Sequence, residues 1–144
     1  MSARILVVDD LEANRRLLEA LLTADYYEVL MATRGEEGVQ LAKREKPDLI
    51  LMDVMMPGGI DGYEACRRLK SMPETRHIPI IILTTLDDRE NRLRGLQAGA
   101  EEFLTKPIDD IQLMARVKSL LALKVVVDEL RAREASGKRM GVIG

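Results

Sequence analysis

The sequence predicts an α/β fold, a doubly wound parallel sheet made of five strand–helix units. Short runs without a polar residue, such as 5–8 and 49–52, are typical of strands buried on both faces of a parallel sheet. Segments with apolar residues at helical spacing lie between such runs, so strand and helix patterns alternate along the chain. The 144 residues, 47% of them hydrophobic and 32% charged, suit one core with a solvated surface.

Each element follows from a local pattern. Strands are expected at residues 4–8, 27–31, 48–52, 78–83 and 101–104. Helices are expected at residues 11–23, 35–44, 63–70 and 88–97, with a last one from Ile108. The second helix must stop near Pro47, which disfavours a helical conformation in the residue before it, and Gly99 is placed to end the fourth. The stretch 56–62 is rich in turn residues and is expected to be a loop.

The last helix is expected to run beyond the sheet. Apolar residues from Ile111 to Val125 lie three or four apart, and a charged stretch from Asp128 to Glu134 follows. An overhanging amphipathic helix usually packs on a partner or leads into a next domain. We therefore assign residues 1–122 to the domain and 123–144 to a helical extension. Within it, we expect 136–144 to be a linker toward an output region in a longer protein.

Composition sets limits on function. Twenty-two basic and 24 acidic residues give a net charge of −2, which offers no general attraction to nucleic acid or to a membrane surface. Cys66 is the single cysteine, which excludes a disulfide framework and favours the reducing cytoplasm. No signal peptide and no membrane-spanning run is expected. His77 is expected on the surface, and Cys66 is expected to be a small packed residue.

Acidic residues follow two of the expected strands. Asp9 and Asp10 come directly after the first strand, and Asp53 comes directly after the third. Right-handed crossovers can place these two strands side by side at the switch point of the sheet, where such folds carry their chemistry. The three carboxylates would then repel one another unless a cation lies between them. Mg²⁺ is the natural choice for a site built of oxygen ligands.

Two other strand ends add a hydroxyl and a cation. The fourth strand leads into Thr84, and the fifth leads into Lys106. Carboxylates, a metal, a lysine and a hydroxyl are the equipment for accepting a phosphoryl group on a carboxylate. In an alternative interpretation Asp9 or Asp10 only caps the first helix, and Lys106 is only a counterion. Capping explains neither Asp53 nor the lysine, so phosphoryl chemistry is favoured.

Four motifs occur in the order of a known family. They are Ile5-Leu6-Val7-Val8-Asp9-Asp10, Asp53-Val54-Met55-Met56-Pro57, Leu83-Thr84 and Lys106-Pro107. With them the chain resembles a response-regulator receiver domain of the CheY-like family over nearly its whole length. Residues 11–14, 105–110 and 128–143 are most similar to the first receiver of PleD-type diguanylate cyclase response regulators. The resemblance implies a flavodoxin-like, five-stranded sheet in the order 2-1-3-4-5.

The resemblance assigns a role to each acidic residue. Asp53 would be the phosphoacceptor and a metal ligand. Asp10 would bind Mg²⁺ directly, Asp9 would bind it mainly through water, and the backbone carbonyl of Met55 would be a further ligand.

The resemblance also assigns roles around the phosphoryl group. Lys106 would contact its oxygens, and would pair with Asp53 before phosphorylation. Thr84 would swing its hydroxyl onto the group, and Phe103 would turn inward as the aromatic switch. Thr85 would contact the phosphoryl group at a position where the family usually has alanine, so it could crowd the entrance. The Lys106-Pro107 bond would be cis, as in the family.

One loop departs from the family pattern. The stretch Gly58-Gly59-Ile60-Asp61-Gly62 carries one residue more than the usual sequence after the phosphoacceptor. We expect the loop beside Asp53 to be longer and looser, with its geometry changed and its chemistry kept.

The expected function is therefore that of a two-component receiver. A sensor histidine kinase or a phosphotransfer protein would donate the phosphoryl group to Asp53, and the receiver would switch conformation and dimerise to control an output. In a PleD-type parent that output would be a diguanylate cyclase, although the cyclase motif Gly-Gly-Glu-Glu-Phe does not occur here. The receiver alone would be a phosphoacceptor with self-catalysed transfer rather than a turnover enzyme. An alternative is a stand-alone, single-domain regulator that acts by docking to other proteins.

Other classes fit the residues less well. Aspartyl phosphohydrolases carry Asp-x-Asp after the first strand, whereas Asp9 and Asp10 are adjacent here. No glycine lies between Val8 and Arg34, so neither a dinucleotide-binding turn nor a P-loop can follow the first strand. A receiver that only binds partners would be expected to lack one of the key residues, and none is missing.

Overall fold

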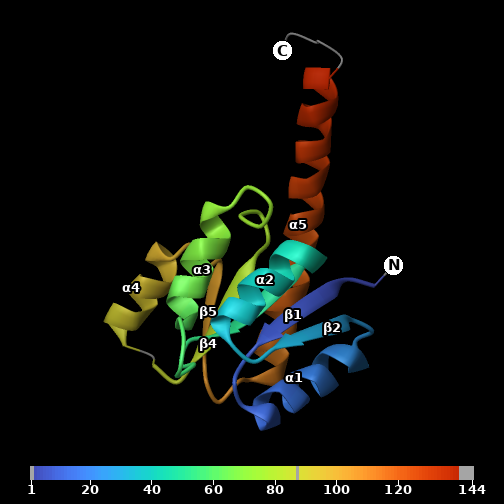
Figure 1. The fold of residues 1–144 in the computed structure, drawn as a ribbon. Coiled ribbons are helices and arrows are strands. Elements are labelled where there is room, and N and C mark those ends of the chain that lie inside the picture. The colour runs from blue at the N-terminus through green and yellow to red at the C-terminus, as the bar shows by residue number, and fades with distance from the viewer. Residues whose placement is uncertain (1, 87, 140–144) are drawn as a thin grey trace.

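A computed structural model describes residues 2–86 and 88–139 of the chain, with side chains up to residue 135. A parallel sheet of five strands lies between two layers of helices (Figure 1). The strands are β1 (Arg4–Val8), β2 (Glu28–Ala32), β3 (Leu49–Asp53), β4 (Ile80–Thr84) and β5 (Glu102–Thr105). The helices are α1 (Glu12–Ala24), α2 (Gly35–Glu45), α3 (Gly62–Ser71), α4 (Arg89–Gln97) and α5 (Asp110–Arg139). The strand order β2-β1-β3-β4-β5 confirms the predicted flavodoxin-like fold.

The two faces of the sheet carry two separate cores. Side chains alternate along each strand, so Leu6 and Val8 of β1 point to one face while Ile5 and Val7 point to the other. The first face is covered by α2 and α3 and by the end of α4, and the second by α1 and α5. This two-sided burial explains why the strands read as continuous apolar runs.

The register places the strand ends that matter next to one another. Val8 of β1 pairs with Met52 of β3, and Asp53 pairs with Leu83 of β4. The expected element boundaries hold within one or two residues. The largest shifts, of two residues, are at β4, which begins at Ile80 rather than Ile78, and at α5, which begins at Asp110 rather than Ile108. Pro79 has no N–H to donate to a neighbouring strand, although its carbonyl accepts a hydrogen bond from the Ile50 N–H at 3.0 Å.

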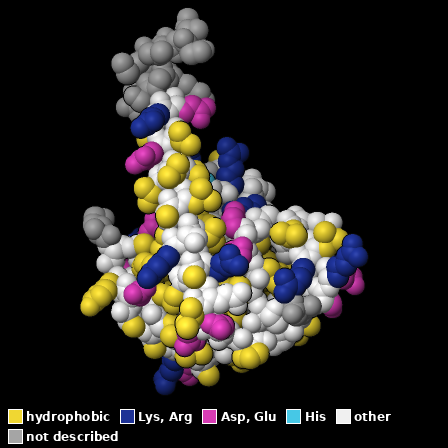
Figure 2. All heavy atoms as spheres, turned by 180° about the vertical axis from the view of Figure 1, so that it is seen from behind, with side chains coloured by type: hydrophobic (Ala, Val, Ile, Leu, Met, Phe, Trp, Pro, Cys, Tyr) yellow, Lys and Arg dark blue, Asp and Glu magenta, His cyan; other side chains and the backbone are white. Residues whose placement is uncertain are grey.

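The last helix projects from the sheet, as expected (Figure 1). Residues 136–139, which the sequence favours as a linker, belong to α5, whose 30 residues are helical to Arg139. Residues 140–144 lie outside the described residues. Apolar side chains remain exposed along α5, among them Leu123, Val126 and Leu130, and Figure 2 shows such side chains along the projecting part. Among the described residues, no helix combines the length and the apolar character needed to cross a bilayer.

Candidate functional site

Three carboxylates meet where β1 and β3 end. These strands are direct neighbours, which brings Asp9 and Asp10 beside Asp53. Each residue contributes one carboxylate oxygen to a group whose atoms all lie within 4.8 Å of one another. Asp9 and Asp53 are buried, at 1% and 5% exposed, and Asp10 is half-buried. The predicted acidic cluster is therefore present, and its oxygens are spaced to share one divalent cation.

Lys106 faces two of the carboxylates from the end of β5. Its ammonium nitrogen Nζ lies 3.1 Å from Asp53 Oδ1 and 3.3 Å from Asp9 Oδ2. The Lys106-Pro107 peptide bond is cis, as expected. One lysine thus stands against three acidic groups, which leaves an excess of negative charge.

The excess negative charge helps to raise the pKa of Asp53. Burial raises the pKa of its carboxyl, repulsion from Asp9 raises it further, and attraction to Lys106 lowers it in part. A perturbed carboxyl among converging charges is typical of a functional site. A cation bound here would favour the ionised form of Asp53, so the residues present fit the expected metal.

Asp9 is tied to the start of α1. Its carboxylate accepts hydrogen bonds from the Leu11 N–H at 2.9 Å and from Asn14 Nδ2 at 3.2 Å. The N-cap position of α1 is Leu11, however, and it makes no side-chain cap. The alternative in which Asp9 or Asp10 only caps the helix is therefore wrong, although Asp9 does fix the turn that precedes it. Asn14 was not predicted to contact the site, because its sequence position places it only somewhere on a helix.

A cavity of about 300 Å³ opens above the carboxylates. Its lining includes Asp10, Asp53, Met55, Thr84, Thr85 and Lys106. Thr84 is buried at the end of β4, and its Oγ1 accepts a hydrogen bond from the Leu86 N–H at 3.1 Å. Thr85 is exposed at the rim. The structure thus brings together all the predicted site residues except Phe103, which lies outside the cavity. Asp9 does not line the cavity either, but it belongs to the carboxylate cluster.

Phe103 lies on β5, half-buried beside α4. The guanidinium carbon of Arg92 is 5.3 Å from the centre of its ring. A Cβ atom on Gly95 would lie 3.0 Å from the Phe103 ring, so the absence of a side chain at Gly95 lets the helix pack closely on it.

The loop after Asp53 is longer than the family pattern and makes hydrogen bonds at two points. The Gly62 N–H donates to the Val54 carbonyl at 3.0 Å and closes the loop at its base. At the far side, the Ile60 N–H donates to Glu36 Oε1 at 3.3 Å. The additional residue is thus in contact with the start of α2, and the expectation of a looser loop stays a prediction.

A comparison with protein families decides the class. The model of the response regulator receiver domain matches residues 5–118. The chain belongs to this family.

Relatives refine this assignment. The receiver is 63% identical to the response regulator PleD of Caulobacter vibrioides over 143 residues, which are 99% of this chain and 31% of PleD. It is 43% identical to protein PilH of Pseudomonas aeruginosa over 83% of this chain and 98% of PilH. Among solved structures, the receiver domain of a sensor histidine kinase from Pseudomonas aeruginosa PAO1 superposes with a TM-score of 0.79 and 33% identity, covering 85% of this chain and 99% of that one. That structure has a magnesium ion coordinated in the active site cleft.

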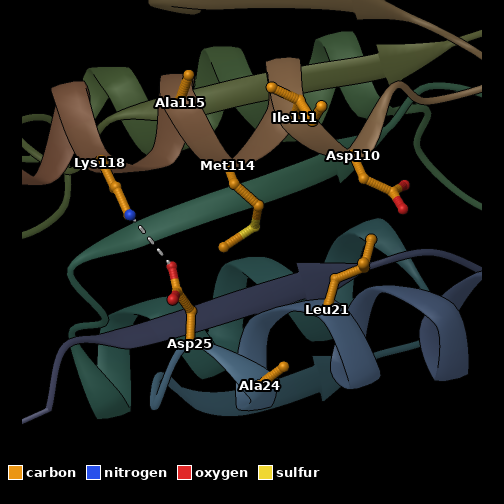
Figure 3. Close-up of a pocket in the computed structure, with 8 residues that line it drawn as sticks. All are labelled: Leu21, Ala24, Asp25, Asp110, Ile111, Met114, Ala115 and Lys118. Atoms are coloured by element: carbon orange, nitrogen blue, oxygen red, sulfur yellow. Dashed lines mark ion pairs between the residues drawn. The ribbon is translucent and has the colours of Figure 1, made fainter.

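The receiver also has a groove between α1 and α5 (Figure 3). It encloses about 530 Å³ and is lined by apolar side chains that include Leu21, Ile111 and Met114. Asp25 and Lys118 point toward each other across one end, 3.7 Å apart. None of the predicted site residues lines this groove. It lacks the converging carboxylates of the cavity above Asp53, so it is not the place of the chemistry.

Proposed function

We propose that this receiver accepts a phosphoryl group on Asp53 from a phosphohistidine of a sensor histidine kinase or a phosphotransfer protein. The observation that carries the proposal is the cluster of three carboxylate oxygens within 4.8 Å, faced by Lys106 at the floor of an open cavity. A buried excess of negative charge costs stability, so its presence at an accessible edge favours a role in chemistry.

The transfer needs little from the protein beyond position and charge. A carboxylate oxygen of Asp53 attacks phosphorus and forms the O–P bond of an acyl phosphate. The P–N bond of the donor breaks, and its electron pair returns to the imidazole nitrogen. Lys106, 3.1 Å from Asp53, is placed to neutralise charge on the phosphoryl oxygens.

Mg²⁺ fits the same site. Asp10, Asp53 and the Met55 carbonyl would hold it directly, with Asp9 acting mainly through water. The bound ion would neutralise charge as it builds on the phosphoryl oxygens. The hydrogen bonds that Asp9 already accepts from Leu11 and Asn14 support the indirect role for that residue.

The signal would leave through the turn after β4. The Thr84 hydroxyl, which now accepts from the Leu86 N–H, would move onto the phosphoryl group, with the backbone of Thr85 beside it. Phe103 would turn inward, and a two-state equilibrium would shift on the face formed by α4, β5 and α5. The output would be homodimerisation, in the reducing cytoplasm.

The wider function depends on the parent protein. The chain spans about a third of the length of PleD, so control of a diguanylate cyclase belongs to this proposal. The second candidate is a stand-alone regulator that acts by docking. It is favoured by the match to nearly the whole length of PilH.

The molar mass in solution tests the proposal. It is measured with Mg²⁺, before and after beryllofluoride is added as a mimic of the phosphoryl group, on wild type and Asp53→Asn. A doubling for wild type alone supports a dimerising switch. A monomer with occupied Asp53 favours docking to another protein. Equal behaviour of wild type and Asp53→Asn would contradict the role of Asp53.

A further inference from the structure

Helix α4 is unusual in how little apolar surface it buries. Of its nine residues, Arg89–Gln97, Gly95 is the one that is buried. Leu93 and Leu96 point to solvent, at 50% and 64% exposed. The other helices on this face bury larger side chains, as α3 does with Tyr63. Because buried apolar side chains are the main anchors of a surface helix, the position of α4 must depend on other contacts.

Besides the packing of Gly95 and Arg92 on Phe103, such contacts come from the first turn of α3. Tyr63 is fully buried, and its hydroxyl lies 3.1 Å from both the backbone oxygen and Oδ1 of Asn91 in α4. Arg94 of α4 stacks over the Tyr63 ring, with its guanidinium carbon 4.4 Å from the ring centre. The same guanidinium lies 3.7 Å from Asp61, the N-cap of α3. A partly buried hydrogen bond and a cation–π contact are thus directed at one helix.

Both ends of this tie adjoin the phosphoacceptor site. On one side, α3 begins at Gly62, which packs so closely that a Cβ atom there would overlap the carbonyl oxygen of Asp53. On the other side, the turn after Thr84 leads to Asp88, the N-cap of α4. The Asp88 carboxylate accepts from the Asn91 N–H at 2.8 Å, so the residue that Tyr63 holds is also bound to the cap. The tie therefore joins the two segments that frame the cavity.

We propose that the Tyr63–Asn91 hydrogen bond, supported by Arg94, holds α4 in its unphosphorylated position and sets how readily the receiver switches. The inference rests on the proposed function, because it assumes that Asp53 accepts a phosphoryl group and that Thr84 responds. When the Thr84 hydroxyl moves, the turn that leads to α4 must move with it. The tie opposes that movement. Tyr63 and Arg94 are positioning residues, and they act on the site through α4.

The experiment measures the beryllofluoride concentration at half-saturation, at saturating Mg²⁺, by titration of amide chemical shifts. Tyr63→Phe keeps the ring and its contact with Arg94 and removes only the hydroxyl. We expect half-saturation at a roughly fivefold lower concentration, the effect of losing one partly buried hydrogen bond from the unswitched state. Arg94→Ala, with its guanidinium partly exposed, should lower it by about twofold.

Tyr27→Phe is the matched control, because Tyr27 packs among the residues of the opposite core, against α1 and α5. It should leave half-saturation unchanged. A merely structural role for Tyr63 predicts weaker binding or none as the domain loses stability, which is opposite in sign. If wild type binds beryllofluoride and Tyr63→Phe binds it equally well or less well, the inference is overturned and the proposed function stands. If wild type does not bind it, both fall.

Discussion

At each end of the sheet a lysine lies between two aspartates, and the aspartates of the two groups differ in burial. At the carboxyl end, Lys106 lies between side chains that are 1% and 7% exposed. At the amino end, Lys124 of α5 lies between Asp48 and Asp128, which are 38% and 43% exposed. Water screens the second group, whereas the first must be balanced by the protein and its ligands. The same residue types therefore form a cluster with buried carboxylates at one end and an ion-pair group with partly exposed carboxylates at the other.

The charge balance differs in the same direction. Asp10 adds a third carboxylate at the carboxyl end. At the amino end an additional cation is present instead, since Arg131 lies 3.6 Å from Asp128. An excess of negative charge favours the binding of a metal cation, whereas a balanced group does not. The two groups therefore differ both in the burial of their carboxylates and in their net charge.

Replacing each lysine by methionine tests most directly whether the two ends of the sheet differ in function. Lys106→Met should slow phosphorylation of Asp53 by a small-molecule phosphodonor by on the order of 10² or more, because a preorganised charge on the phosphoryl oxygens is lost. Lys124→Met should leave that rate unchanged and should cost ~0.5 kcal/mol of folding stability. The appearance of the acyl phosphate over time, followed by intact mass, measures the rate. Equal rates for the two variants would remove the distinction between the two ends.

The next effect is on stability. The raised pKa of Asp53 means that the fold favours its protonated form. Asp53 therefore costs no stability below the ordinary pKa of a carboxyl, about 4, and destabilises the fold as pH rises through the raised value. At neutral pH without Mg²⁺, Asp53→Asn should be more stable by ~1 kcal/mol, or a rise of ~4 °C in Tm. The stability gain of Asp53→Asn should vanish below about pH 4, where the carboxyl of Asp53 is protonated in both the folded and the unfolded chain.

Mg²⁺ sharpens the same measurement. In thermal unfolding, Mg²⁺ should raise the Tm of wild type more than that of Asp53→Asn, because the variant has lost one carboxylate ligand. Asp48→Asn at the amino end is the control, and Mg²⁺ should shift its Tm by as much as it shifts that of wild type. A gain for Asp53→Asn that persists at acid pH would mean that charge is not its cause.

The sequence could predict which residues meet at the carboxyl end of the sheet, because the order of the strands largely determines their positions. Once β1 and β3 are recognised as buried parallel strands, their carboxyl ends must meet, and Asp9, Asp10 and Asp53 come with them. Lys106 and Thr84 follow for the same reason from β5 and β4. None of these placements depends on how a side chain packs.

Contacts made between helices and loops could not be predicted in this way. The tether of Ile60 to Glu36 spans 24 residues, and the bond between Tyr63 and Asn91 spans 28. Nothing in the local pattern of either pair indicates its partner, because helix orientation decides which side chains meet.

His77 shows the same limit at the amino end of the sheet. Its position in a turn predicts a surface residue, and this is wrong in part. The side chain is half-buried, and its Nδ1 atom is buried with no hydrogen-bond partner among the described residues. It lines a hollow together with Arg131 and Glu134, because the long α5 passes over the turn. A helix of average length, about 10–14 residues, would have ended before Arg131 and left His77 more exposed.

The smallest predicted effect concerns this histidine. Burial lowers its pKa below the ordinary value of 6.5, and the nearby charges of Arg131 and Lys124 lower it further, while Asp128 acts against them. The fold therefore favours neutral imidazole. As pH falls below about 6.5, the unfolded chain takes up a proton that the folded chain does not, so stability falls until the lowered pKa is passed.

In His77→Gln this acid-side loss should be smaller than in wild type, whereas stability above about pH 7 should be similar. Melting curves across this pH range measure the difference, and because the chain has one histidine, its proton resonance reports the pKa directly. Truncation of the chain after residue 122 removes Lys124, Asp128 and Arg131, and should return the pKa of His77 toward its ordinary value. A resonance that titrates at or above that value in the full chain would show that α5 does not cover the turn. The amino end of the sheet would then be open to solvent, and its ion pairs could not be compared with those around Lys106.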